Sequence, residues 1–410
     1  MRVLLMSYGS RGDVAPMAAL AVALRERGAE ARVCAPPDEE FARLLAGVGV
    51  PMVPFGRSVR ALVNSAERPS KSAPEVAAEL VAAHFETVGA AAEDCDAVVA
   101  SGLLPAGVRS VAEKRGIPYV CACFQPWTLP SPARRPLPRP GRPFPPGVTD
   151  NRVLWKLDAE KVNALYGEPL NSHRAAIGLP PVDNVRDHVF TDRPWLATDP
   201  VLAPWDEPEE IDVVQTGAWI FKDERPLPAE LEAFLEAGEP PVYVGFGSMP
   251  MRDAPDIARI AVEAVRAQGR RVLVSRGWAG LAPTGDDDCF TVGDADHHKL
   301  FRRVAAVVHH GGAGTTTAAA LAGAPQVVVP QIVDQPLWAA RVAELGIGAA
   351  HDGPTPTFES LSAALRAALT PETRTRATAV AGTIRTDGAD VAARLVLEAI
   401  ARDERPVTTA

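Results

Sequence analysis

The run with the clearest chemical pattern is Val-His-His-Gly-Gly-Ala-Gly-Thr-Thr at positions 308–316. An apolar strand is expected to end at His309, and a helix to begin within the glycines. Glycines let an anion approach the backbone, and a helix N-terminus offers free N–H groups and a partial positive charge. The run therefore predicts a phosphate-binding turn, although a tight turn with one core histidine is the plain alternative. Its members are His309, His310, Gly311, Gly312, Ala313, Gly314 and Thr315.

A second polar turn, Gly-Ser-Arg-Gly-Asp at positions 9–13, follows the first expected strand. A carboxylate at a strand–helix junction can act as a general base on an incoming hydroxyl group, which makes Asp13 a candidate catalytic residue with Ser10 beside it. On local spacing alone, an aspartate that only caps the helix is the simpler explanation.

Other candidates follow strands in the second half. Asp334 and Gln335 can exchange hydrogen bonds with vicinal hydroxyls, or Asp334 can cap a helix ahead of Pro336. Ser248 can bind a phosphate oxygen, and Trp278 can stack on a flat ring. A turn serine and a core tryptophan are the alternatives.

Several site types are not indicated by the sequence. There is no Gly-Lys-Ser/Thr of a P-loop and no Gly-x-Gly-x-x-Gly fingerprint. No Gly-x-Ser-x-Gly elbow is present, which disfavours a hydrolase of that type. The histidines and five cysteines lack ligand spacing, so we expect no protein-bound metal and no disulfide framework.

Composition places the chain among ordinary globular proteins. It has 410 residues, 47% hydrophobic and 23% charged, with a formal net charge of −9. The acidic balance argues against a general nucleic-acid binder. We read no export signal and no apolar run near the ~20 residues that span a bilayer, and we expect a cytoplasmic protein without membrane association.

Strand and helix signals alternate in both halves, which predicts an α/β fold of two Rossmann-like doubly wound domains facing across a cleft. We expect an N-terminal domain over residues 1–200, a linker over 201–228, a second domain over 229–390 and a C-terminal helix over 391–410 that packs back on the first domain. Two stretches break the alternation. One is residues 57–72, and the other is residues 126–147, where nine prolines exclude a helix or a central strand.

Together these residues resemble a GT-B nucleotide-sugar glycosyltransferase. The glycine run followed by Pro-Gln-Ile-Val-Asp-Gln-Pro at positions 330–336 is similar to the donor signature of family 1 natural-product glycosyltransferases. Further stretches, at positions 1–13, 171–182, 214–220 and 272–278, resemble the actinomycete enzymes that glycosylate vancomycin- and teicoplanin-type glycopeptides. The similarity spans essentially the whole chain.

The resemblance implies roles for individual residues. Asp13 would be the catalytic base, and the glycine run with Ser248 would hold the donor diphosphate. Arg276, Trp278 and Val292 would lie at the nucleobase and ribose, and Asp334 and Gln335 would read sugar hydroxyls. The two irregular stretches correspond to acceptor loops, whose arginines can meet a carboxylate of the acceptor or simply be solvated: Arg57, Arg134, Arg135, Arg139 and Arg142.

The implied activity is an inverting, metal-independent transfer of a sugar, glucose or N-acetylglucosamine by preference, to a hydroxyl of a glycopeptide aglycone. The partners would be a UDP- or TDP-sugar co-substrate, with no separate cofactor, and the aglycone; we expect a monomer. The alternatives are a TDP-deoxysugar transferase acting on a glycopeptide or polyketide aglycone, a non-catalytic nucleotide-sugar-binding partner protein, and another GT-B chemistry such as nucleotide-sugar epimerisation.

Overall fold

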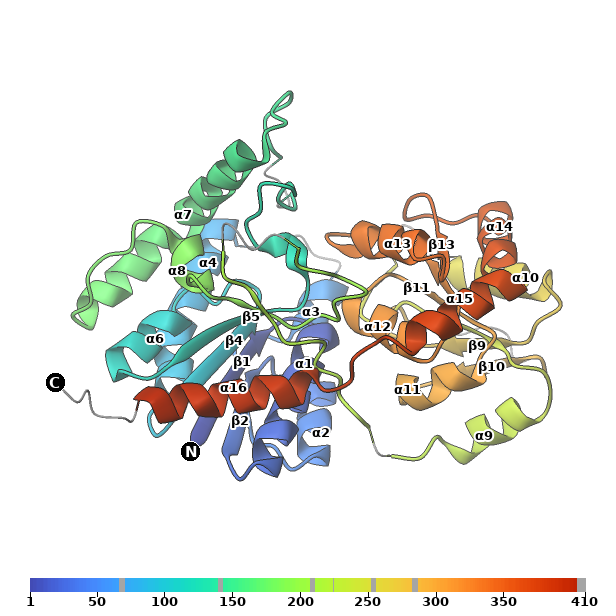
Figure 1. Cartoon of the computed structure of the whole chain (residues 1–410), viewed down its shortest axis with the longest axis horizontal. Coiled ribbons are helices and arrows are strands. Elements are labelled where there is room, and N and C mark those ends of the chain that lie inside the picture. The colour runs from blue at the N-terminus through green and yellow to red at the C-terminus, as the bar shows by residue number, and fades with distance from the viewer. Residues whose placement is uncertain are drawn as a thin grey trace. The chain divides into compact units, whose positions relative to one another are not determined.

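The computed structural model describes residues 1–65, 71–138, 143–206, 211–223, 225–251, 256–281 and 287–403 (Figure 1). The chain divides into two compact units. The first consists of Met1–Pro200, Pro204–Phe221 and Arg385–Ala410, and the second of Val201–Ala203 and Lys222–Ile384. The stretch predicted as a linker, 201–228, is thus shared between the units, and Arg139 and Arg142 lie outside the described residues.

The first unit is built on a parallel sheet in the order β3-β2-β1-β4-β5-β6-β7. Val3 of β1 lies beside Ala31 of β2 and Ala97 of β4. Central strands of a parallel sheet are covered on both faces, which is why β1 reads as a continuous apolar run. The strands are β1 (Arg2–Tyr8), β2 (Glu30–Ala35), β3 (Met52–Pro54), β4 (Ala97–Gly102), β5 (Tyr119–Cys123), β6 (Trp195–Leu196) and β7 (Val214–Gln215).

Helices of this unit connect and cover the strands. They are α1 (Arg11–Glu26), α2 (Glu39–Gly47), α3 (Val59–Asn64), α4 (Ala73–Ala83), α5 (Gly89–Ala91), α6 (Val108–Arg115), α7 (Asn151–Ala176), α8 (Val185–Phe190) and α16 (Gly388–Asp403). Between α4 and α5, residues His84–Val88 form a π-helical turn, η1. A short 3₁₀ turn, η2 (Pro126–Thr128), opens the proline-rich stretch.

The second unit repeats the architecture with a parallel sheet in the order β10-β9-β8-β11-β12-β13. Its strands are β8 (Val242–Gly245), β9 (Val272–Ser275), β10 (Cys289–Val292), β11 (Ala306–His309), β12 (Gln326–Val328) and β13 (Gly348–Ala350). Its helices are α9 (Ala229–Glu236), α10 (Ile257–Arg266), α11 (His297–Leu300), α12 (Ala313–Leu321), α13 (Gln335–Glu344), α14 (Phe358–Ala368) and α15 (Pro371–Ala381), with a 3₁₀ turn η3 (Phe301–Arg303).

Some strands and one helix are not predicted by the sequence pattern. The strands β6, β7 and β13 are two or three residues long, too short for an alternation pattern to be visible. Helix α15 carries the sequence Pro-Glu-Thr-Arg-Thr-Arg-Ala-Thr-Ala-Val-Ala and buries only Ala377 and Val380, so it lacks a clear apolar stripe. None of the helices in the described ranges is long and apolar enough to cross a membrane.

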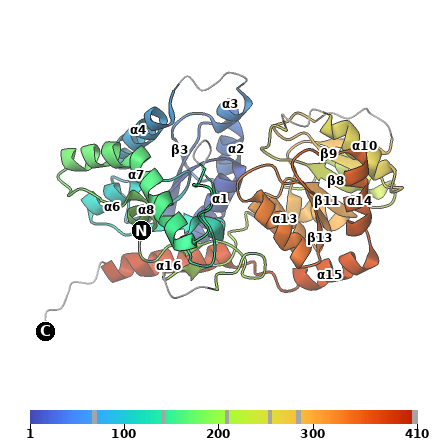
Figure 2. The same cartoon turned by 90° about the horizontal axis from the view of Figure 1, so that it is seen from above.

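The C-terminal helix α16 belongs to the first unit. It packs against α1, and both views show it with the elements of that unit (Figures 1 and 2). Val396 and Ile400 are buried, and Arg27 forms an ion pair with Asp390 at 2.8 Å. Where the chain re-enters this unit, the backbone of Gly388 lies so close to Gly217 that a Cβ atom would come within 2.5 Å of the Gly217 carbonyl. The first unit is therefore completed by the end of the chain.

Truncating a buried side chain of α16 tests this packing. We expect Ile400→Ala to lower the free energy of unfolding by about 2–4 kcal/mol, because it removes buried methyl groups and leaves a cavity. The exposed Arg394→Ala on the same helix is the control and should change it by less than about 0.5 kcal/mol. Urea unfolding followed by tryptophan fluorescence measures both, and equal effects would contradict the packing of α16.

Candidate functional site

Asp13 lies at the carboxyl end of β1, in the first turn of α1. Ser10, not Asp13, is the N-cap residue, and the Asp13 carboxylate oxygen Oδ2 accepts a hydrogen bond from the Ser10 N–H at 2.8 Å. A Cβ atom on Gly9 would lie 2.1 Å from Asp13 Oδ2 and 2.4 Å from its Cγ. The carboxylate is thus held in one position by the turn that precedes it, and Gly9 leaves the space that it occupies.

The loop after β3 is fastened to the same edge of the sheet. Tyr8, the last residue of β1, donates a hydrogen bond from its hydroxyl to the Arg57 carbonyl at 3.2 Å. Phe55 contacts the Tyr8 ring edge-on and stacks on buried His84. The Arg57 guanidinium forms an ion pair with Glu79 at 3.1 Å and is about half exposed. Arg57 therefore stays at the surface near the turn that carries Asp13.

The predicted acceptor arginines of the proline-rich stretch differ in their surroundings. Arg134 forms an ion pair with Asp206 at 2.6 Å, lies over the Trp205 ring and also donates to the Pro204 carbonyl. It therefore fastens the stretch to the rest of the first unit. Arg135 is exposed.

Most predicted donor residues come together within the second unit, at the carboxyl ends of neighbouring strands. The loops after β8, β9 and β11 touch one another through glycines. The Trp278 N–H donates to the Gly247 carbonyl at 2.8 Å, and a Cβ atom on Gly247 would lie 3.1 Å from His310 Cε1. Since β8 lies directly between β9 and β11, Ser248, Trp278 and His310 belong to adjacent loops at one edge.

The two histidines have separate tasks. His309 is fully buried; its Nε2 lies 2.9 Å from Gln326 Oε1, and its Nδ1 accepts a hydrogen bond from the Gly311 N–H at 3.1 Å. Both ring nitrogens are used within the fold, so His309 shapes the turn. His310 Nδ1, in contrast, is buried with no hydrogen-bond partner among the described residues. Of the pair, only His310 has a ring nitrogen left for a ligand.

Burial keeps both rings neutral. Desolvation lowers the pKa of His310 to about 3, and it lowers the pKa of His309 to about 4, against a smaller raising effect of the Gln326 hydrogen bond. At neutral pH, His310 thus carries one proton and one lone pair on its ring. The unpartnered Nδ1 can donate to a phosphate oxygen only in the tautomer in which Nδ1 carries the proton.

The glycine turn leads directly into α12. Gly312 is the N-cap and makes no side-chain cap, and the helix begins at Ala313, followed by Gly314 and Thr315. Gly311 has φ of +92°, and a Cβ there would lie 2.8 Å from the side chain of Val328. Because no side chain covers its first turn from the cap position, the first N–H groups of α12 are suited to an anion.

Asp334 and Gln335, the two residues predicted to bind sugar hydroxyls, differ in their hydrogen-bond partners. Gln335 is buried, and its Oε1 accepts from the backbone N–H groups of Gln331 and Ile332 at 2.8 and 3.1 Å. Asp334 accepts from the Trp338 indole N–H at 2.9 Å, and burial raises its pKa against a smaller lowering effect of that bond. Gln335 folds the loop, which leaves Asp334 with the larger hydrogen-bonding capacity for a ligand.

Two of the three residues predicted to lie at the nucleobase and ribose are buried in the core of the second unit. Trp278 is 9% exposed and Val292 is 3% exposed, while Arg276 is exposed and donates its backbone N–H to the Val292 carbonyl. The Trp278 ring therefore has little free surface, and only Arg276 of the three extends into solvent.

Two contributors were missed by sequence reasoning. Gln326 fixes the His309 ring. The sequence feature that could have indicated it is a polar residue at the start of an otherwise apolar strand. The Met249 sulfur accepts a hydrogen bond from Gln335 Nε2 at 3.4 Å and so connects the loop after β8 to α13. Nothing in the sequence pattern around Met249 predicts this contact.

Comparison with known proteins identifies the chain. Residues 3–132 match the glycosyltransferase family 28 N-terminal domain, and residues 287–393 match the C-terminal domain of erythromycin biosynthesis protein CIII-like proteins. The chain is 58% identical to glycosyltransferase GtfE and 56% identical to vancomycin aglycone glucosyltransferase, both of Amycolatopsis orientalis, over the full length of each chain. The chain belongs to the GT-B glycosyltransferase family of these enzymes.

Solved structures agree with this glycosyltransferase fold. The chain superposes on a glycotransferase of kitacinnamycin with a TM-score of 0.72 at 20% identity, covering 97% of this chain and 99% of the other. It superposes on the glycosyltransferase VinC, solved with DTDP, with a TM-score of 0.68 at 20% identity, covering 98% and 100%. The predicted fold class and enzyme class are confirmed.

The buried histidines of the glycosyltransferase predict a dependence of stability on pH. Because folding lowers the pKa of His310 to about 3 from its ordinary 6.5, the unfolded chain binds the additional proton below pH 6.5 and stability falls as the pH drops. The slope from one such group approaches about 1.4 kcal/mol per pH unit. We expect His310→Gln to flatten this slope in urea unfolding measured at pH 7, 6 and 5. An unchanged slope would show that folding does not lower the pKa of His310.

Proposed function

We propose that this glycosyltransferase moves a sugar from a nucleotide diphosphate to a hydroxyl group of a glycopeptide aglycone, with inversion at the anomeric carbon and without a metal or separate cofactor. The observation that carries the proposal is the glycine turn before α12, with the unpartnered Nδ1 of His310 beside it. Full-length identity of 56% to vancomycin aglycone glucosyltransferase supports the acceptor class. We also propose that the enzyme is a cytoplasmic monomer.

The first unit supplies the base in this proposal. A carboxylate oxygen of Asp13 takes the proton of the acceptor hydroxyl, and the acceptor oxygen then forms a bond to the anomeric carbon of the donor. The bond between that carbon and the diphosphate oxygen breaks, and the diphosphate leaves. The Ser10 N–H holds the carboxylate in place while it carries the proton.

The second unit binds the leaving group. The negative charge that develops on the diphosphate faces the first N–H groups of α12 and the His310 ring, with Ser248 in the neighbouring loop. Donors fixed by the fold need no reorganisation when this charge appears, so they stabilise the transition state more than the ground state. His309 contributes by holding the Gly311 N–H.

For the sugar, we propose glucose or N-acetylglucosamine on UDP, because Asp334 is present with hydrogen-bonding capacity for a hydroxylated hexose. A TDP-deoxysugar is the second candidate. It is favoured by 52% identity to the dTDP-epi-vancosaminyltransferase of Amycolatopsis orientalis over 99% of this chain. Both candidates use the same base and the same diphosphate turn.

Mass spectrometry of the enzyme with a glycopeptide aglycone and one donor at a time tests this function. We expect a hexose or N-acetylhexosamine mass gain on the aglycone with UDP-glucose or UDP-N-acetylglucosamine. A gain only with a TDP-deoxysugar would select the second candidate. Nucleotide-sugar binding without a gain from any donor would overturn the transferase activity on this acceptor class.

Asp13→Asn separates the base from the helix cap. The amide oxygen can still accept from the Ser10 N–H, but it cannot take up the proton of the acceptor. We expect kcat to fall by about 10²–10⁴, the usual contribution of a general base. The free energy of unfolding should change by no more than about 1 kcal/mol, the value of one charge at a helix N-terminus. Undiminished turnover would remove Asp13 from the mechanism.

Two glycines of the same turn make a matched pair. Gly9→Ala places a methyl group where Asp13 Oδ2 now lies, so the carboxylate must move, and we expect kcat to fall by about 10²-fold, as for a displaced catalytic group. Gly12→Ala meets no atom closer than Ser10 Oγ at 3.8 Å and should retain activity. Steady-state kinetics of the two variants decides this, and equal kcat values would show that the position of the carboxylate is not critical.

A further inference from the structure

The loop after β4 is joined to the turn that carries Asp13. In the sheet, Tyr8 of β1 lies beside Gly102 of β4, and the Leu103 N–H donates a hydrogen bond to the Tyr8 carbonyl at 2.8 Å. The Asp13 carboxylate meets the next residue along, because a Cβ atom on Gly9 would lie 2.1 Å from its Oδ2. Leu103 and the carboxylate proposed as the base are therefore connected through two successive residues at the end of β1.

Leu103 presents its side chain to solvent from a fixed backbone. On one side, Gly102 has φ of +87°, and a Cβ atom there would lie 2.6 Å from the Tyr8 carbonyl oxygen. On the other side, Leu104 packs against the core, and the Ala106 N–H donates to the Leu104 carbonyl at 2.9 Å. Leu103 itself is 50% exposed. A half-exposed leucine on a backbone held at both ends is preorganised for an apolar contact.

The loop after β5 adds aromatic side chains at the same edge of the sheet. Strand β5 pairs in parallel with β4, so the two loops leave neighbouring strands side by side. Phe124 and Trp127 are partly exposed in this loop. The Trp127 N–H donates to the side-chain oxygen of Gln125 at 2.8 Å, which fixes the turn that carries the indole.

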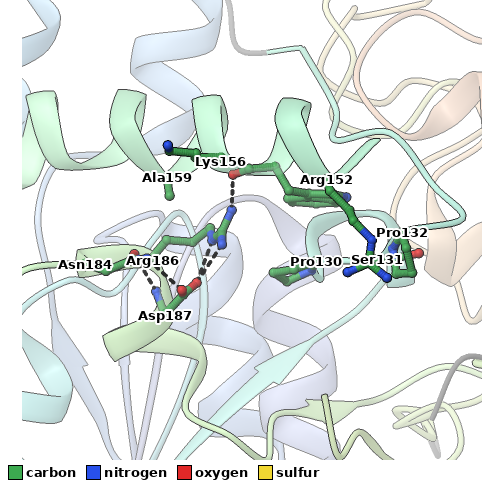
Figure 3. A pocket seen from close by; sticks show the side chains of 10 residues that line it. Pro130, Ser131, Pro132, Arg152, Lys156, Ala159, Asn184, Arg186 and Asp187 are labelled. Atoms are coloured by element: carbon green, nitrogen blue, oxygen red, sulfur yellow. Dashed lines mark hydrogen bonds and ion pairs between the residues drawn. The ribbon is translucent and has the colours of Figure 1, made fainter. Parts of the chain in front are cut away.

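The far end of the loop after β5 is anchored at the start of α7. Leu129 is fully buried, and Asn151 Nδ2 donates to the Pro132 carbonyl at 2.8 Å. Figure 3 shows residues 130–132 beside Arg152, where they line a hollow of about 320 Å³ together with residues of α7 and α8. Contacts within the first unit therefore hold this loop in position.

Neither loop carries a charge. Residues 102–107 and 124–133 contain no Asp, Glu, Lys or Arg, in a chain in which 23% of the residues are charged. Strand β3 lies on the other side of β1 in the sheet, and the loop after it presents the ion pair of Arg57 and Glu79. In strand order, the Asp13 turn thus has charged side chains on one side and apolar side chains on the other.

We propose that Leu103, Phe124 and Trp127 bind the apolar surface of the acceptor next to its reactive hydroxyl, with Leu103 as a specificity-determining residue. The inference rests on the proposed function, in which Asp13 takes the proton of that hydroxyl. An acceptor whose hydroxyl lies at Asp13 passes close to Leu103, because both are fixed to the end of β1. An uncharged, partly aromatic surface favours aromatic or aliphatic groups over charged ones. Leu103 takes no part in proton transfer.

Steady-state kinetics of Leu103→Ser with a glycopeptide aglycone and the donor that supports transfer tests this contact. We expect the KM for the aglycone to rise about three- to tenfold, the effect of no longer burying about half of a leucine side chain. The kcat and the KM for the donor should stay unchanged, because the lost contact is made equally in the ground state and the transition state. Leu103→Met keeps the apolar area and should keep the wild-type KM.

Val48→Ser is the matched control. Val48 is a partly exposed apolar residue between α2 and β3, so it lies at the opposite edge of the same parallel sheet. This variant should keep the wild-type KM for the aglycone. Calorimetric titration of the aglycone gives a second readout, since the heat-capacity change of binding should be less negative in Leu103→Ser than in the wild type.

The other outcomes separate this contact from the function on which it rests. An unchanged KM for the aglycone in Leu103→Ser, or an equal rise in Leu103→Met, would overturn the contact and leave the transferase function intact. A fall in kcat without a change in KM would also overturn it, because Leu103 would then act on the position of Asp13. Absence of transfer by the wild-type enzyme from every donor would overturn the proposed function itself.

Discussion

Close backbone approach at the carboxyl ends of parallel strands is the constraint on which the two candidate sites depend. In the first unit, the space left by Gly9 is filled by the carboxylate of Asp13. In the second, a Cβ atom on Gly277 would lie 2.7 Å from the Gly247 carbonyl, and one on Gly312 would lie 2.6 Å from His310 Nε2. Side chains at these positions would push apart the loops that carry the functional groups. Glycine is thus needed here for space, and at Gly247, Gly277 and Gly311 for positive φ as well.

At the end of β11, the neighbouring residues His309 and His310 differ in their hydrogen bonding. Successive side chains of a strand point to opposite sides, so neighbours at its end meet different surroundings. His309 meets Gln326 at the start of β12 and satisfies both ring nitrogens, whereas the ring of His310 is turned by 85° relative to it and has an unpartnered Nδ1. One ring sets the conformation of the turn, and the other is left with unused hydrogen-bonding capacity.

Capping a helix and binding a ligand use the same hydrogen-bonding groups, so the sequence alone is compatible with either role for Asp13 and Asp334. Asp13 does take part in the cap of α1, and Asp334 does stand at the N-cap of α13. Neither role uses all the lone pairs of a carboxylate, which has about four acceptor positions. A residue at the start of a helix can therefore also be a base or a sugar ligand. The Ser10 N–H orients the Asp13 carboxylate, and the Trp338 indole N–H orients that of Asp334.

The sequence by itself determined the two parallel sheets, the glycine turn at 309–315 and the glycosyltransferase family, because periodicity and motif spacing are local properties. It also located Asp13, Ser248 and Asp334 at strand ends. Only the tertiary structure separated His310 from His309, assigned the Gln335 carbonyl to its own loop, and paired Arg134 with Asp206. It also brought Lys156 and Arg186 to one hollow from helices α7 and α8. These distinctions depend on which hydrogen-bond partners and charges arrive from distant parts of the chain, and no local pattern records them.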